Sequence, residues 1–268
     1  MASSVALRGL GINQLFSLDW ETVSILSDSM PTDHLFLEGP LFQFPIQEGQ
    51  GLRNHSDITF YKIRPGSARI GHLINLPATK LSAFRYIAED YQEPNGQNWN
   101  DPMLEILYDL NSSQGKCLKT LCLGLFNPPR GYSGLPVSPS MGSLEALTHL
   151  WIDSGKRDAR WTYETIRSFT LPNHYAPNLV HLRITGPIKN LAEWISFMRT
   201  EGRSVWKHLK TFGINNEDLV KLYSQSLESL DIKLELIEEN DDITLWNNQG
   251  KKVEVLKDVR NSIKYVVD

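Results

Sequence analysis

The sequence has few cysteines, no long apolar run and no excess of basic residues. Cys117 and Cys122 are the two cysteines among 268 residues, too few for a disulfide framework. A C-x4-C pair without a second Cys or His pair at ligand spacing is also a poor zinc site. No apolar run approaches the roughly 20 residues that a membrane span needs. The formal net charge is −4, from 27 basic against 31 acidic residues, so we expect neither a membrane nor a nucleic acid as partner.

The start of the chain and its composition place it among folded intracellular proteins. The first residues, MASSVALRGLGINQLF, lack the basic segment followed by a continuous apolar segment that a secretory signal peptide requires. Apolar residues make up 41% of the chain and charged residues 22%, which is typical of a folded domain. We therefore expect a cytoplasmic or nuclear protein.

What the sequence does contain is a repeated motif, L-x-x-L-x-L or a close variant. Five strong copies fall in the second part of the chain, and they are Leu118/Leu121/Leu123, Leu147/Leu150/Ile152, Leu179/Leu182/Ile184, Leu209/Phe212/Ile214 and Leu227/Leu230/Ile232. Weaker copies are anchored at Leu10, Leu35, Ile58, Phe84 and Val253. The ten anchors run from position 10 to position 253, so the mean gap is about 27 residues, the length of one supersecondary unit.

The spacing within each copy predicts a short strand. Two apolar residues two positions apart point to one face of a strand, and the residues between them point to the other. The stretches between copies have apolar residues at helical spacing, in the ranges 19–29, 102–112, 163–169, 190–200 and 216–224. Strand, helix and strand in succession predict parallel strands joined by right-handed crossovers. The sequence therefore predicts one α/β solenoid domain over residues 1–268, with a curved parallel sheet on its concave face and helices and loops on its convex face.

The repeats resemble those of the leucine-rich-repeat family, and the resemblance covers residues 7–256. Their irregular lengths are similar to the repeat region of F-box proteins, fungal ones especially, in which such repeats bind the protein to be ubiquitylated. The resemblance implies a protein-interaction module, with a protein partner on the concave face. An F-box would precede the repeats, and the first repeat-like motif begins at Leu7, so a Skp1-type adaptor would bind through a missing or separate segment. The alternatives are a stand-alone inhibitor or scaffold, or a small-ligand-binding repeat protein.

Two polar stretches lie between the predicted units. NPPRGYSGLPVSPSMG, residues 127–142, follows a predicted strand and reads as a loop, because it contains four prolines and three glycines. In the small-ligand alternative this loop roofs a pocket beside Trp151. LIEENDD, residues 236–242, has four acidic residues and reads as a solvated loop or, less favoured, as an acidic patch that faces a partner.

The residues that point away from the core are the candidates for binding. Trp151 is predicted to lie beside Arg183, and His149 beside His181, because neighbouring strands are about 4.8 Å apart. A large aromatic and an arginine are the residue types enriched at interface hot spots. The full set of candidate partner-binding residues is His149, Trp151, Asp153, His181, Arg183, Arg85 and Tyr61. In the alternative interpretation loop 127–142 covers Trp151, and Arg183 stacks on it as a structural cation-π pair.

The sequence offers little for catalysis. It has no G-x-S-x-G, P-loop, G-x-G-x-x-G or H-E-x-x-H motif. His149 and Asp153 are four residues apart on a predicted strand, about 13 Å, so they cannot form a proton relay by themselves. We expect a protein that is not an enzyme and that uses no cofactor and no metal.

Overall fold

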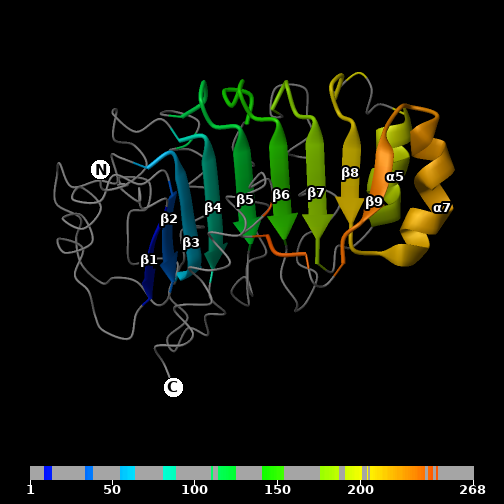
Figure 1. Cartoon of the computed structure of the whole chain (residues 1–268). Helices are drawn as coiled ribbons and strands as arrows, with labels where there is room; N and C mark the ends of the chain where they lie inside the picture. Colours follow the sequence, from blue (N-terminus) through cyan, green and yellow to red (C-terminus); the bar gives the residue numbers. More distant parts are fainter. Residues whose placement is uncertain are drawn as a thin grey trace, which may run out of the picture.

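A computed structural model gives the fold of the chain. It describes residues 9–13, 34–38, 55–63, 81–88, 110, 114–124, 141–153, 176–186, 191–200, 204, 206–238, 241–243 and 246. The described part forms one open sheet in which every strand is parallel to its neighbours (Figure 1).

The sheet has nine strands, and their order in space is their order in the chain. The strands are β1 (Gly9–Asn13), β2 (His34–Glu38), β3 (Asp57–Ile63), β4 (Ala83–Ala88), β5 (Thr120–Gly124), β6 (His149–Asp153), β7 (His181–Thr185), β8 (Thr211–Ile214) and β9 (Lys233–Leu236). All arrows in Figure 1 point the same way, so each strand is reached by a connection that returns to the starting edge of the sheet. This is the arrangement that the strand-and-return pattern predicts.

The register agrees with the predicted anchors from the first strand to the eighth. Each anchor is the direct partner of the next along the row Leu10, Leu35, Ile58, Phe84, Leu121, Leu150, Leu182 and Phe212. The anchor predicted at Val253 lies outside the described residues.

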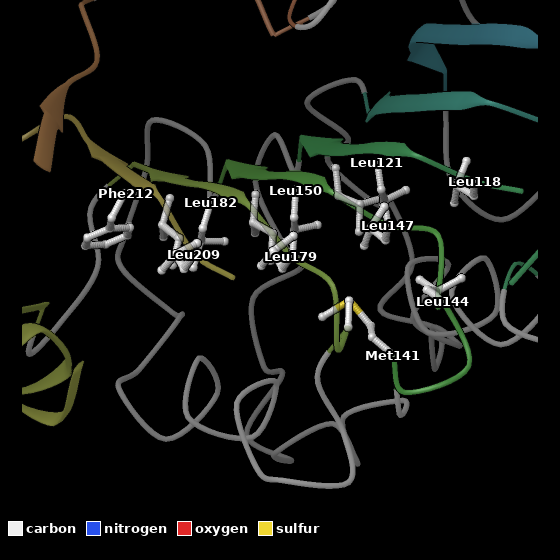
Figure 2. Close-up of a cluster of buried hydrophobic side chains, with 14 of the residues drawn as sticks. Leu118, Leu121, Met141, Leu144, Leu147, Leu150, Leu179, Leu182, Leu209 and Phe212 are labelled. Carbon is white, nitrogen blue, oxygen red and sulfur yellow. The ribbon is translucent and has the colours of Figure 1, made fainter. Parts of the chain in front are cut away.

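One face of the sheet, here called the core face, carries the main apolar core. Its side chains come from the two apolar positions of the strands β2 to β8, as in Leu150 and Ile152, and all of these are buried. The leucine three residues before the anchors of β5 to β8 turns into the same core, and Leu118, Leu147, Leu179 and Leu209 form a second row beneath the first (Figure 2). The motif L-x-x-L-x-L therefore encodes two layers of core.

The backbone before each strand repeats the same hydrogen bonds. The carbonyl of Lys119 accepts from the amides of Thr148 and His149, and the carbonyl of Thr148 accepts from Val180 and His181. Ser56, Ser82 and Val180 accept two amides from the next unit in the same way. One carbonyl of each unit thus accepts hydrogen bonds from the amides that begin the next strand. These bonds favour stacking of successive units over folding of any unit alone.

Two helices are described, both at the C-terminal side of the sheet. α5 (Leu191–Thr200) and α7 (Glu217–Glu228) agree with the helices predicted over 190–200 and 216–224. The side chain of Asn216 caps α7, because it accepts a hydrogen bond from the amide of Leu219 at 3.0 Å. In the part of the chain that the structure describes, neither helix has the length and apolar content to cross a membrane. The other predicted helices lie outside the described residues, except for residue 110.

The predicted position of the ninth strand is wrong. Phe212 pairs with Leu234 and not with Leu230, and the strand begins at Lys233. Leu227 is still in α7, and Asp231 adopts a left-handed backbone conformation with φ 62° in the turn that follows. The L-x-x-L-x-L spacing of Leu227, Leu230 and Ile232 therefore falls on the end of α7 and the turn that follows it.

Candidate functional site

The opposite face of the sheet, here called the second face, carries the predicted binding residues. His149 pairs in register with His181, and Trp151 pairs with Arg183, as the sequence predicts. Glu235 and Lys233 of β9 belong to this face as well, because Gly213 and Thr211 pair with them. Ser229 and Asp231 do not belong to it, since they precede the strand.

The second face is not open over β4 to β6, which corrects the expectation drawn from the sequence. Trp151 is 3% exposed and belongs to a separate apolar cluster with Ile87, Cys122, Ile237 and Ile243. Ile237 and Ile243 come from the chain that leaves β9 and runs back over the sheet (Figure 1). We call residues 237–246 the C-terminal segment; the structure describes residues 237, 238, 241–243 and 246 of it. The predicted cover, loop 127–142, lies outside the described residues except for its last two positions.

Trp151 lies at the centre of an aromatic and cationic cluster. The guanidinium carbon of Arg183 lies 5.0 Å from the centre of the Trp151 ring, which agrees with the cation-π pair of the alternative interpretation. The ring of Trp246 meets Trp151 edge to face at 5.7 Å and 87°, and Arg183 lies 5.1 Å from it. The indole nitrogen of Trp151 donates to Oγ1 of Thr185 at 2.9 Å, so the buried N–H is satisfied.

The two histidines of this face stack on each other. The ring centres of His149 and His181 are 4.3 Å apart, and the ring of Trp246 packs against His149 at 5.4 Å. Burial, His181 and Arg183 together lower the pKa of His149 to about 4. Burial and Arg183 also lower the pKa of His181, although the carboxylate of Glu235 opposes them. Both rings are therefore neutral at pH 7, and neutral rings stack without charge repulsion.

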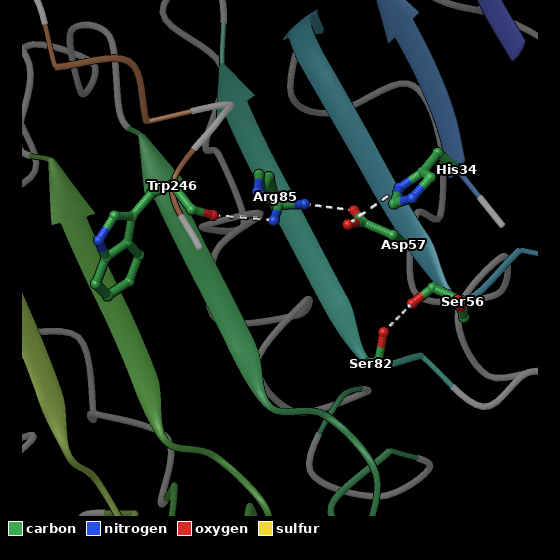
Figure 3. Close-up of polar contacts among 6 residues, drawn as sticks. All are labelled: His34, Ser56, Asp57, Ser82, Arg85 and Trp246. Atoms are coloured by element: carbon green, nitrogen blue, oxygen red, sulfur yellow. Dashed lines mark hydrogen bonds and ion pairs between the residues drawn. The ribbon is translucent and has the colours of Figure 1, made fainter. Parts of the chain in front are cut away.

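Arg85 belongs to a buried ionic network and not to an accessible surface. Its side chain is fully buried, and one guanidinium nitrogen pairs with the carboxylate of Asp57 (Figure 3). His34 lies on the other side of that carboxylate, with 3.2 Å between Nδ1 and Oδ2. Burial alone raises the pKa of Asp57, but Arg85 and His34 outweigh it and hold the pKa below its ordinary value. The other guanidinium nitrogen donates to the carbonyl of Trp246 at 3.1 Å. Through this hydrogen bond Arg85 holds the C-terminal segment on the second face.

Tyr61 packs against the apolar cluster that contains Ile87 and Trp151, and Asp153 lies at the end of β6. Tyr61 is half-buried, with its ring centre 6.0 Å from that of Phe36 on β2. Asp153 is half-buried at the end of β6, opposite Thr185. Of the seven predicted residues, the structure brings together His149, Trp151, His181 and Arg183, and it places Arg85 beneath the C-terminal segment.

The thiol on this face is not a nucleophile. Cys122 is fully buried, and this burial raises its pKa to about 12. At neutral pH it is therefore protonated and packs as a small apolar side chain.

The second face stays partly exposed over β7 to β9. The side chains of Arg183 and Glu235 lie 3.8 Å apart and are 19% and 25% exposed. Lys233 reaches Glu235 at 3.3 Å, and its own side chain is 72% exposed. This end of the face offers one acidic and two basic groups beside the histidine pair.

Sequence reasoning missed the C-terminal segment. Ile237, Ile243 and Trp246 are apolar residues outside the predicted repeat anchors, and Trp246 follows an acidic stretch that reads as solvated. Apolar side chains without a place in the repeat were the signal that could have indicated a cover. No protein-family model and no curated protein matches this chain.

Proposed function

We propose that this chain is a leucine-rich-repeat solenoid that binds another protein on the second face, over β7 to β9. The observation that carries the proposal is the partly exposed row of unlike side chains there. His181 and Arg183 of β7 and Glu235 of β9, on either side of β8, present an aromatic ring, a cation and an anion within one patch. Side chains of these types, half-buried beside an aromatic cluster, suit a polar and aromatic protein surface.

The repeat assignment is supported by the backbone as well as by the motif. The paired amides that meet one carbonyl recur from unit to unit, and the anchors form one row across eight strands. In repeat proteins of this kind the exposed side of the strands presents an extended binding surface. In the F-box-like version of the proposal the partner is a protein to be ubiquitylated, and a Skp1-type adaptor joins through a separate segment.

The small-ligand alternative has less support. It requires a closed cavity beside Trp151, and the rings of Trp246 and His149 and the side chain of Arg183 occupy that place. The stand-alone scaffold and the F-box-like receptor share the same face, so the partner's identity distinguishes them.

Affinity capture followed by mass spectrometry tests the proposal. Lys233→Glu reverses a charge on the second face, and Lys221→Glu reverses one on α7, where the lysine is similarly exposed at 68%. We expect a partner that the wild-type chain and Lys221→Glu retain and that Lys233→Glu loses. Recovery of ubiquitin-ligase subunits with it favours the receptor, and a single target without them favours the scaffold. Equal recovery with all three chains would refute binding at this face.

A further inference from the structure

The C-terminal segment makes the kind of contacts that a bound peptide makes. Its main chain is held at two points: the amide of Ile237 donates to the carbonyl of Ile214 at 2.8 Å, and the carbonyl of Trp246 accepts from Arg85. Its apolar side chains, Ile237 and Ile243, are buried against the second face. The described residues between these points are not strands of the sheet, so side-chain packing holds the segment rather than a continuous ladder of hydrogen bonds.

The position of Trp246 is specific for a flat aromatic side chain. Its ring meets His149 at 70° and Trp151 at 87°, both edge to face, and the Arg183 guanidinium lies 5.1 Å from its centre. Edge-to-face contacts and a cation over the ring each need an aromatic π-system, and tryptophan gives the strongest cation-π contact. An aliphatic side chain would fill the same space but make none of these contacts.

The segment also covers the site of the proposed function. Arg183 belongs to the candidate surface and contacts Trp246, and His149 beside that surface contacts Trp246 as well. A partner that reached these side chains fully would have to take the place of Trp246. Glu238 and Asp241 of the segment are exposed, so acidic groups keep its outer side in water.

We propose that the C-terminal segment is an internal ligand of the second face, and that the protein partner displaces it with an extended stretch carrying an aromatic residue. This residue takes the position of Trp246, and the Arg85 guanidinium binds the main-chain carbonyl beside it. The inference rests on the proposed function, because it names the chemistry of the partner for the same face. While the segment is bound, the apparent affinity for the partner is reduced to the fraction of molecules whose face is free.

The direct test uses a synthetic peptide with the sequence of residues 235–249, labelled with fluorescein, and the full chain. Fluorescence anisotropy measures its binding to the wild type, to Trp246→Ala and to Leu222→Ala, a control on an exposed residue of α7. We expect Trp246→Ala to bind the peptide at least about tenfold more tightly than the wild type and Leu222→Ala, because its own segment no longer competes. A peptide in which alanine replaces the tryptophan should lose this binding.

A second variant keeps the test independent of any loss of folding. Trp246→Leu keeps an apolar side chain in the cover but removes the aromatic contacts, and it should also bind the peptide more tightly than the wild type. Thermal melts establish that each variant is folded. Equal peptide affinity for the wild type and the folded Trp246 variants, or no binding to any of them, would overturn the inference.

The partner itself provides a separate arm. A partner that depends on Lys233 in the capture experiment should be displaced by the peptide and should bind Trp246→Ala more tightly than the wild type. If the peptide binds as expected but does not compete with that partner, the partner binds elsewhere on the face and this inference is wrong while the proposed function stands. If no partner depends on Lys233, the proposed function fails even where the peptide binds Trp246→Ala.

Discussion

Replacing Trp151 with alanine probes whether the second face is covered. The ring is 3% exposed, contacts Trp246 and Arg183, and donates to Thr185. A buried tryptophan covers roughly 150–250 Å², which at about 25 cal/mol per Å² corresponds to about 4–6 kcal/mol. Measured truncations of buried aromatic residues cost about 3–5 kcal/mol, since neighbours relax into part of the cavity. We expect Trp151→Ala to lower the free energy of unfolding by about 3–5 kcal/mol.

Leu182→Ala is the matched comparison, because Leu182 is equally buried on the core face of the next strand. It should cost about 2–5 kcal/mol, so the two single variants alone do not distinguish the faces. The distinction comes from Trp246→Ala as a second substitution. Trp151→Ala and Trp246→Ala remove the same contact, so their effects should depart from additivity by about 0.5–3 kcal/mol. Leu182→Ala and Trp246→Ala should add within about 0.5 kcal/mol, because the sheet separates them.

Urea unfolding followed by far-ultraviolet circular dichroism measures the wild type and all five variants without relying on tryptophan fluorescence. Trp151→Phe serves as a further control, because it keeps an aromatic ring and loses the hydrogen bond to Thr185. It should cost about 1–2 kcal/mol. A loss below about 1 kcal/mol for Trp151→Ala, or additive effects with Trp246→Ala, would mean that the C-terminal segment does not cover this face.

Three further predictions follow from the second face. Asp57→Ala leaves the Arg85 charge buried without its carboxylate, so it should lower the free energy of unfolding in urea by about 3–5 kcal/mol. The double variant Asp57→Ala with Arg85→Met should recover much of this loss, because it removes the unpaired charge. A double variant that recovers none of it would contradict the pairing. Gly213→Ala places a Cβ 2.6 Å from Ile237, so we expect the free energy of unfolding to fall by about 1–3 kcal/mol. We also expect faster proteolysis of the C-terminal segment, and an unchanged digestion pattern would count against this contact. The pKa of His149 is lowered from 6.5 to about 4, so the unfolded chain binds the proton more readily and stability should fall as pH drops from about 6.5 towards 4. His149→Gln should flatten this slope in thermal melts at several pH values, and an equal slope in both chains would refute the assignment.

The cover of the second face shows where prediction from the sequence ended. His149, Trp151, His181 and Arg183 were placed correctly relative to one another, since period-two alternation and the row of anchors fix both face and register. Their accessibility to solvent was not predicted correctly, because the residues that cover them come from outside the repeats. Arg85 illustrates this best: its partner, the carbonyl of Trp246, is 161 residues away in the chain.

The amino-acid sequence by itself determined the parallel order of the strands, the core face and the pairing of residues across eight strands. These properties follow from local spacing, because each unit buries its apolar positions against the equivalent apolar positions of its neighbours. The tertiary structure alone decided three things: that β9 begins at Lys233, that the Arg85–Asp57 pair is buried, and that Trp246 packs on Trp151. The last two depend on side chains distant in sequence meeting in a low-dielectric interior, and spacing within one unit carries no information about such a meeting. The first depends on where α7 ends and on the left-handed residue Asp231 in the turn after it.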